Sequence, residues 1–306
     1  MLQQFNEYRQ QFMEYLQIER NASMHTLKNY LRDLHSFYTF ICNEGVNEFG
    51  QINEQLIRIY LTNLHRDNYS RRTISRKLAS LRSFYKFMIR EEFVKYNPFL
   101  HVHTPKPVHE IPSFFYAEEM EKLFTISDLN SPLGQRNQAI LELLYATGIR
   151  VSECVGIYLE DIDFDLGIVL VTGKGRKDRY LPFGSYAENA LTKYIENGRS
   201  YLLGKAKVNN NALFLNAKGN PLSERGVRLI LNKLVEKSAL TVDIHPHKLR
   251  HTFATHMLNE GADLRVVQEL LGHEHLSSTQ IYTHVTKDHL RNIYRNSHPR
   301  ATNGNN

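Results

Sequence analysis

Residues 245–256 read HPHKLRHTFATH, and the fold can be worked out from this stretch outward. Pro246 suits the first turn of a helix, because that turn has no use for the backbone donor that proline lacks. Leu249, Phe253 and Met257 then recur every four residues, which predicts one buried stripe along the helix. A helix packed on a core by this stripe leaves its other faces open to a ligand.

His247, Arg250 and His251 lie on another face of the same helix. An imidazole and a guanidinium one turn apart can converge on one anion, which the guanidinium grips with two parallel hydrogen bonds. Histidines that only satisfy buried hydrogen bonds are one alternative, and a zinc site at His247 and His251 is another. Against zinc, no Glu stands where a zinc hydrolase places its base, and Arg250 would repel the cation.

Downstream, the stretch ADLRVVQELLGH predicts a short helix that is N-capped by Asp263 and ended by Gly272. This helix would deliver His273 just past its end. Residues 278–284, STQIYTH, are predicted to open a further helix that carries Tyr282. A lone tyrosine is usually a packing residue, and the chain has 17 of them.

Upstream, residues 145–153 read YATGIRVSE and predict a helix, a glycine turn and a second helix that begins at Arg150. A helix N-terminus favours an anion, and an arginine there strengthens the attraction. Arg150 can equally pair with Glu153 one turn further on. The two roles are compatible.

A β-hairpin is predicted further along the chain, where the strands IVLVT and RYL flank the glycine turn of residues 173–178, GKGRKD. Lys174 lies in this turn, with Lys177 as a rival, and a solvated loop is the alternative to a functional one. Apart from this small antiparallel sheet, residues 112–306 form a mainly helical domain by their apolar periodicity. Helices resume from Leu222.

The first part of the chain, residues 1–94, predicts a small four-helix domain with N-caps at Ser23, Asn53 and Ser70. Four prolines between residues 97 and 112 favour extended backbone, so residues 95–111 are interpreted as a linker between two domains.

One helix of the first domain is strongly basic: it carries Arg71, Arg72, Arg76 and Lys77 beside an apolar stripe. These four side chains are candidates for contacts with DNA phosphates, and a solvated surface helix is the alternative. The net charge of +6 over 306 residues suits a polyanionic partner.

The chain contains no apolar run of ~18 residues that could span a membrane, and its N-terminus lacks the pattern of a secretion signal. We therefore expect a cytoplasmic protein. Cys42 and Cys154, the only cysteines, lie in apolar helical patterns, so we expect reduced and buried thiols.

Together these motifs resemble the catalytic set of the tyrosine recombinases, and the resemblance extends through both domains. Six residues stand in the family's order and context: Arg150 in TGIRVSE, Lys174 in GKGRKDR, His247 and Arg250 in HPHKLRHTFATH, His273 in LLGH, and Tyr282 in TQIYTH. Type IB topoisomerases share the chemistry but usually have Lys at the place of His247. The ending HPRA and the stretch GADLRVVQELLGH are similar to the bacterial recombinases that resolve chromosome dimers.

The resemblance implies an N-terminal core-binding domain and a C-terminal catalytic domain that needs neither cofactor nor metal. Tyr282 would attack a DNA phosphodiester, and Arg150 and Arg250 would hold its non-bridging oxygens. His247 would act as the base, His273 would contact the phosphate and Lys174 would protonate the leaving oxygen.

The implied partners are double-stranded DNA at a recombination site, a paralogous recombinase in a heterotetramer on that DNA, and a septal DNA translocase. The implied role is resolution of chromosome dimers at cell division. An integrase of a phage or mobile element and a type IB topoisomerase-like enzyme are the alternatives.

Overall fold

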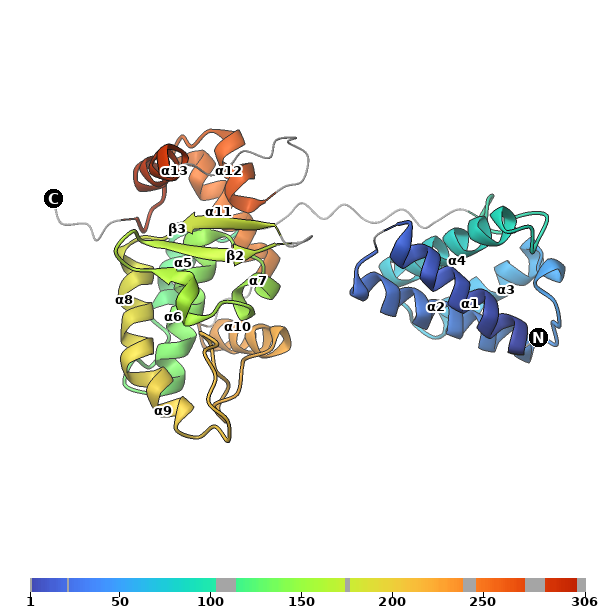
Figure 1. Cartoon of the computed structure of the whole chain (residues 1–306), viewed down its shortest axis with the longest axis horizontal. Coiled ribbons are helices and arrows are strands. Elements are labelled where there is room, and N and C mark those ends of the chain that lie inside the picture. The colour runs from blue at the N-terminus through green and yellow to red at the C-terminus, as the bar shows by residue number, and fades with distance from the viewer. Residues whose placement is uncertain are drawn as a thin grey trace. The chain divides into compact units, whose positions relative to one another are not determined.

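The computed structural model describes residues 2–20, 22–102, 114–173, 177–238, 246–272 and 284–301. The chain divides into two compact units, Met1–Glu110 and Ile111–Asn306, and each has its own hydrophobic core (Figure 1). No helix in the described ranges is long and apolar enough to cross a membrane.

The first unit is a helical bundle, as the apolar periodicity predicts. Its elements are α1 (Leu2–Ile18), α2 (Met24–Asn43), the 3-10 turn η1 (Phe49–Gln51), α3 (Glu54–Arg66) and α4 (Arg71–Arg90). The three predicted N-caps are confirmed. The side chains of Ser23, Asn53 and Ser70 accept the backbone N–H three residues on, at 3.2, 3.0 and 3.2 Å.

The core of this unit extends beyond the four helices into the stretch interpreted as a linker. Phe99 is fully buried in it, and Arg82 of α4 donates to the carbonyl of Phe99 at 3.0 Å. Tyr96 donates to the carbonyl of Ile52 at 2.8 Å. Residues 95–102 are thus packed on the first unit.

The two cysteines differ in burial. Cys154 is buried as predicted, and burial raises the pKa of its thiol to about 12. Cys42 is exposed, so the prediction of a buried thiol is wrong at that position. Ile41 takes the core-facing place on α2, and the next residue of a helix points roughly 100° away from it.

The second unit is mainly helical with one small sheet, as predicted. Its first elements are α5 (Ala117–Phe124), α6 (Pro132–Thr147), α7 (Val151–Val155), the 3-10 turn η2 (Leu159–Asp161), β1 (Ile162–Asp163), β2 (Ile168–Thr172) and β3 (Asp178–Pro182). Those that follow are α8 (Ser185–Lys193), the π-helical turn η3 (Tyr194–Arg199), α9 (Ser200–Leu203), α10 (Glu224–Ser238), α11 (Pro246–Asn259), α12 (Leu264–Leu271) and α13 (His284–Ser297).

Helix α6 is the centre of this unit and is buried on nearly every side. It lies against α8 and η3 on one side and against α10 and α11 on others (Figure 1). The stripe of α11 packs into the same core, where Leu249, Phe253 and Met257 are all buried as predicted. Elements far apart in sequence therefore meet around the end of α6.

The predicted hairpin is confirmed. β2 pairs with β3 antiparallel in the register Val169↔Leu181 and Thr172↔Asp178, and β1 adds a short third strand on the other edge of β2. Residues 174–176 of the turn, including Lys174, lie outside the described residues. Helices α8 and α9, which follow the hairpin, had no counterpart in the sequence prediction.

Candidate active site

Arg150 stands at the start of α7, directly after the turn that ends α6. Gly148 makes this turn with a φ of +61°, and a Cβ there would lie 2.4 Å from the ring of Phe253, so only glycine fits. Glu153 accepts the backbone N–H of Arg150 at 2.8 Å and its guanidinium at 2.9 Å. The anticipated Arg150–Glu153 pair is thus present, while 37% of the Arg150 side chain stays exposed.

Arg250 reaches the same place from α11. Its guanidinium donates to the carbonyl of Gly148 at 2.8 Å and to the carbonyl of Leu271 at the end of α12. Burial, together with the neighbouring positive charge of Arg150, lowers the pKa of Arg250 to about 10. The side chain therefore remains a cation at neutral pH.

A third arginine, Arg179 on β3, was missed by the sequence reasoning. It donates to both carboxylate oxygens of Glu153, from Nη1 at 3.0 Å and from Nη2 at 2.8 Å. One signal was available: the two-residue period of a strand places Arg179 on the inward face with Leu181, and a charged residue there needs a partner.

Arg150 and Arg179 share the carboxylate of Glu153. Burial raises its pKa, but hydrogen bonds from Arg179 and from Arg150 outweigh burial and place the pKa below its ordinary value. Glu153 is therefore ionised at neutral pH, and its carboxylate forms ion pairs with two guanidinium groups.

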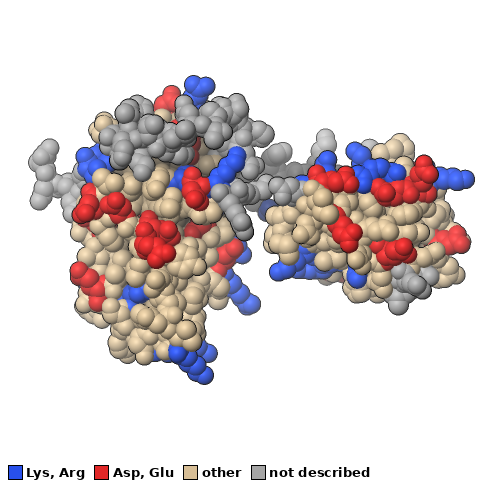
Figure 2. Space-filling view, in the orientation of Figure 1, with Lys and Arg blue, Asp and Glu red and all other residues tan. Residues whose placement is uncertain are grey.

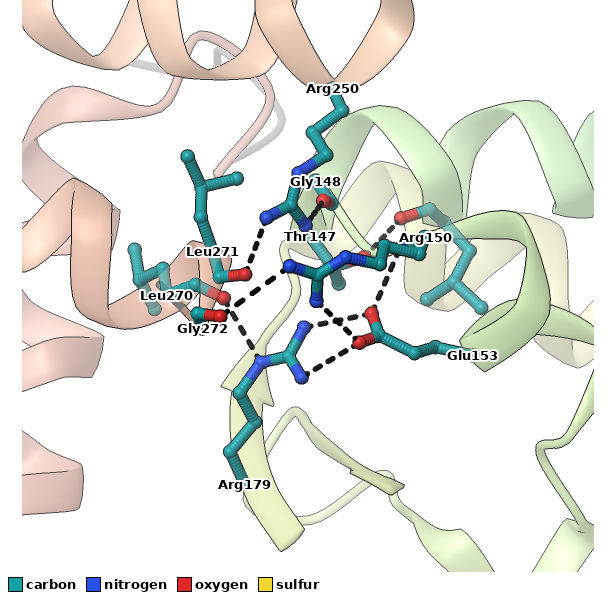
Figure 3. Close-up of polar contacts among 10 residues, drawn as sticks. Thr147, Gly148, Arg150, Glu153, Arg179, Arg250, Leu270, Leu271 and Gly272 are labelled. Carbon is teal, nitrogen blue, oxygen red and sulfur yellow. Dashed lines mark hydrogen bonds and ion pairs between the residues drawn. The ribbon is translucent and has the colours of Figure 1, made fainter. Parts of the chain in front are cut away.

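The C-terminal end of α12 collects all three arginines (Figure 3). The accepting carbonyls and their donors are Leu270 with Arg179 at 3.2 Å, Leu271 with Arg250, and Gly272 with Arg150 at 3.4 Å. The last carbonyls of a helix have no partner within it and carry a partial negative charge, which suits cations. The helix end thus holds three positive side chains close together.

The limits of α12 are those predicted. Asp263 is the N-cap and accepts the backbone N–H of Arg265 at 2.7 Å, and Gly272 ends the helix with a φ of +66°. Since His273 follows Gly272 directly, the chain leaves this helix beside the three arginines.

The six predicted catalytic residues are described only in part. Arg150 and Arg250 are brought together from α7 and α11. His247 is exposed on the first turn of α11, one turn before Arg250. Three residues lie outside the described part of the chain: Lys174, His273 and Tyr282.

The arrangement can bind an anion with two charges and several hydrogen bonds. A guanidinium has five N–H donors, and the carbonyls and Glu153 use only some of those on Arg150 and Arg250. A phosphate diester is such an anion. Within the described ranges, no three His, Cys, Asp or Glu side chains are grouped to hold a metal ion.

In the first unit, the candidate DNA-binding residues divide into two kinds. Arg71 and Arg72 are exposed in the first turn of α4. Arg76 and Lys77 instead bind Asp33 of α2, which is buried: Arg76 forms an ion pair with it, and the Lys77 Nζ lies 3.8 Å from its carboxylate. Figure 2 shows acidic and basic side chains interspersed on the visible face of each unit.

Curated relatives match nearly the whole chain. "Tyrosine recombinase XerC" of Oceanobacillus iheyensis is 57% identical over 304 residues, which cover 99% of each chain. The protein of the same name in Bacillus subtilis is 56% identical over 290 residues, 95% of each chain, and the one in Listeria innocua is 50% identical over 299 residues, 97% of this chain and 99% of that one.

Solved structures share the fold. A Tn1549 transposon integrase in complex with circular intermediate DNA matches with a TM-score of 0.70 at 19% identity, over 94% of each chain. The XerH site-specific recombinase in its post-cleavage complex with palindromic difH matches with a TM-score of 0.68 at 22% identity, over 94% of this chain and 84% of that one.

Two family models divide the chain as its two units do. The model of the N-terminal SAM-like domain of phage integrases matches residues 10–92, and the model of the phage integrase family itself matches residues 113–289, more than half of the chain. The chain belongs to the phage integrase family.

Proposed function

We propose that this protein is a site-specific DNA recombinase, which cuts and rejoins double-stranded DNA through a 3′-phosphotyrosine intermediate. The observation that carries the proposal is the convergence of Arg150 and Arg250 on the end of α12, next in sequence to His273. Similarity to relatives named tyrosine recombinases over nearly the full chain supports the reaction class.

In the cleavage step, the phenol oxygen of Tyr282 attacks the phosphorus and the bond to the 5′-oxygen breaks. Negative charge grows on the non-bridging oxygens in the transition state. Arg150 and Arg250 stabilise this charge, and an arginine does so without the risk of losing its own proton. Positive side chains thus supply the neutralisation that a divalent ion gives in other enzymes.

Proton transfer falls to the remaining residues of the set. A phenol with a pKa of about 10 is mostly protonated at neutral pH, so a base assists the attack, and His247 is our candidate. Lys174 gives the proton that the leaving 5′-oxygen requires. His273 donates a hydrogen bond to the phosphate.

Rejoining is the reverse reaction with a different strand. The phosphotyrosine retains the energy of the phosphodiester, so a 5′-hydroxyl from a partner duplex can displace Tyr282 and seal the junction. No ATP, metal or other cofactor takes part. In the first unit, Arg71 and Arg72 contact DNA phosphates, and the partly exposed Arg76 makes a further phosphate contact. The burial of Lys77 favours a role in holding Asp33.

For the biological role, we propose resolution of chromosome dimers at cell division, in the cytoplasm. The partner is an XerD-like paralogous recombinase in a heterotetramer on DNA, and a septal DNA translocase regulates the assembly. The support is that relatives 50–57% identical over at least 95% of the chain carry the name XerC.

A nicked suicide substrate tests the reaction, because loss of the short cleaved strand traps the covalent protein–DNA adduct. Wild type should form the adduct with or without EDTA, and Tyr282→Phe should form none. An adduct in Tyr282→Phe would exclude this nucleophile, and loss of cleavage on chelation would restore the zinc hypothesis for His247 and His251.

The same preparation separates the alternatives. Relaxation of supercoiled DNA without strand exchange would favour a type IB topoisomerase-like enzyme. Exchange that needs no paralogous recombinase, on the ends of a mobile element, would favour an integrase.

A further inference from the structure

We propose that Arg179 is a positioning residue for the cleavage step: it shares the charge of Glu153, so that Arg150 keeps its positive charge for the phosphate. This inference rests on the proposed function. It concerns a residue outside the six that the family motifs identify.

All three guanidinium nitrogens of Arg179 donate to protein groups, so we assign Arg179 an indirect role. Its Nε donates to the carbonyl of Leu270, and its two terminal nitrogens donate to the two oxygens of Glu153. The residue is buried. Whatever Arg179 contributes to the reaction, it contributes through Glu153 and through the end of α12.

The charges explain why a second arginine on Glu153 matters. Arg150, Arg179 and Arg250 carry three positive charges against the single negative charge of Glu153, which leaves a net charge of +2 in the cluster. Without Arg179, the carboxylate would pair with Arg150 alone and cancel its charge. The net charge available to a phosphate would then fall to +1.

The Arg179 guanidinium packs against two glycines, each of which directly precedes a predicted catalytic residue. A Cβ at Gly173, which precedes Lys174, would lie 3.2 Å from Arg179 Nη1. A Cβ at Gly272, which precedes His273, would lie 3.1 Å from Arg179 Cζ. Both glycines therefore let the guanidinium approach their backbone.

Arg199 provides a matched control in the same unit. It is as buried as Arg179, and its guanidinium donates to the backbone carbonyls of Ala212 and Asn210. These partners belong to a loop at the far end of α9 and not to the arginine cluster. Arg199→Gln should lower the unfolding temperature and leave the cleavage chemistry unchanged.

The experiment compares single-turnover cleavage of two suicide substrates by the full chain at saturating DNA. One carries an ordinary scissile phosphate, and the other carries a methylphosphonate, whose methyl group replaces a non-bridging oxygen and removes the negative charge. Arg179→Gln should slow cleavage of the phosphate by about 10²-fold, the scale on which a lost electrostatic contact acts, and slow the methylphosphonate only a few-fold. A purely structural role would slow both equally.

A double variant that restores the net charge of the cluster is the second test. It also distinguishes a loss of charge from a folding defect. Glu153→Gln combined with Arg179→Gln removes one charge of each sign and returns the net charge to +2. The double variant should therefore cleave the phosphate faster than Arg179→Gln alone, a non-additive result that only coupled residues give.

The outcomes separate this inference from the proposed function. If wild type forms no adduct on either substrate, the proposed function fails and the inference with it. If wild type cleaves and the phosphate-to-methylphosphonate rate ratio of Arg179→Gln equals that of wild type and of Arg199→Gln, only the inference fails. A double variant slower than Arg179→Gln would also overturn it.

Discussion

Each unit of the protein buries one carboxylate between two cations. We call them the Glu153 cluster and the Asp33 cluster, and their members are Glu153 with Arg150 and Arg179, and Asp33 with Arg76 and Lys77. In each, one cation is buried and the other is an arginine about one third exposed, 37% for Arg150 and 35% for Arg76. In both clusters the carboxylate thus holds an arginine that stays partly exposed.

The clusters differ in what they join. The Asp33 cluster links two neighbouring helices of one bundle, α2 and α4. The Glu153 cluster links α7 with a strand, and its arginines also bind the end of α12 beside Arg250. Because a buried ion pair adds little net stability over apolar packing, the position of the exposed arginine is the main thing each cluster provides. We infer that one arginine serves chemistry and the other serves DNA binding.

The largest expected effect comes from removing Arg250, which lies beside the Glu153 cluster. Arg250→Ala should slow adduct formation at saturating DNA by about 10²–10³-fold, because one of the two phosphate clamps is lost. Single-turnover cleavage of the suicide substrate measures this. Arg136→Ala, which removes an equally buried arginine bound to the carbonyl of Leu215, is the control and should cleave normally. A rate for Arg250→Ala within tenfold of wild type would break the comparison.

The second effect is on stability and falls on the first unit. Asp33→Ala leaves Lys77 buried without its carboxylate, and breaking a buried pair in this way should cost about 3 kcal/mol of unfolding free energy. Hydrogen exchange of peptides from α2 and α4, measured in the whole chain, should report it. Glu19→Ala, which removes an exposed ion pair with Arg90 of α4 in the same unit, is the control and should leave this protection nearly unchanged. Equal protection in both variants would contradict the role given to Asp33.

Acid should weaken the second unit through His298 and leave Glu153 ionised. Burial lowers the pKa of His298 to about 3 from the ordinary 6.5, so between these values the unfolded chain binds a proton that the folded chain does not. The free energy of unfolding is therefore highest well above pH 6.5. It decreases as the pH falls below 6.5, by about 1 kcal/mol between pH 6.5 and pH 5.5. Denaturant unfolding at pH 7 and 5.5 tests this, and a pH dependence that persists unchanged in His298→Gln would refute it.

The smallest expected effect is on DNA binding by the first unit. Arg72→Ala should weaken DNA binding and lower the slope of log affinity against log salt by about 1, the loss of one phosphate contact. Titrations at several salt concentrations measure the slope. Arg228→Ala, at an exposed position of the second unit, is the control. An unchanged slope in Arg72→Ala would remove this residue from the DNA interface.

Local signals in the sequence predicted much of the fold. The caps Ser23, Asn53 and Ser70, the hairpin of β2 and β3, and both ends of α12 follow from residue types at fixed offsets. Each of these depends on neighbours only a few residues apart, which is why sequence reasoning found them.

Long-range pairing was beyond such signals. Arg179 meets Glu153 across 26 residues and Lys77 meets Ser36 across 41, so no local pattern identifies these partners, although the strand period does indicate that Arg179 points inward. The same limit explains Lys77, which was grouped with phosphate contacts although its side chain turns inward. Of the predicted site, the meeting of Arg150 with Arg250 is described, and the place of Tyr282 remains a prediction.

The most direct test of the contrast between the two clusters measures Arg150→Ala and Arg76→Ala together. For both, single-turnover cleavage at saturating DNA is compared with the dissociation constant for the same DNA. We expect Arg150→Ala to cleave at least about 100-fold more slowly with little change in affinity, and Arg76→Ala to bind more weakly but cleave at the wild-type rate once saturated. Near-normal cleavage by Arg150→Ala, or an equal loss of cleavage rate in both variants at saturation, would contradict the account.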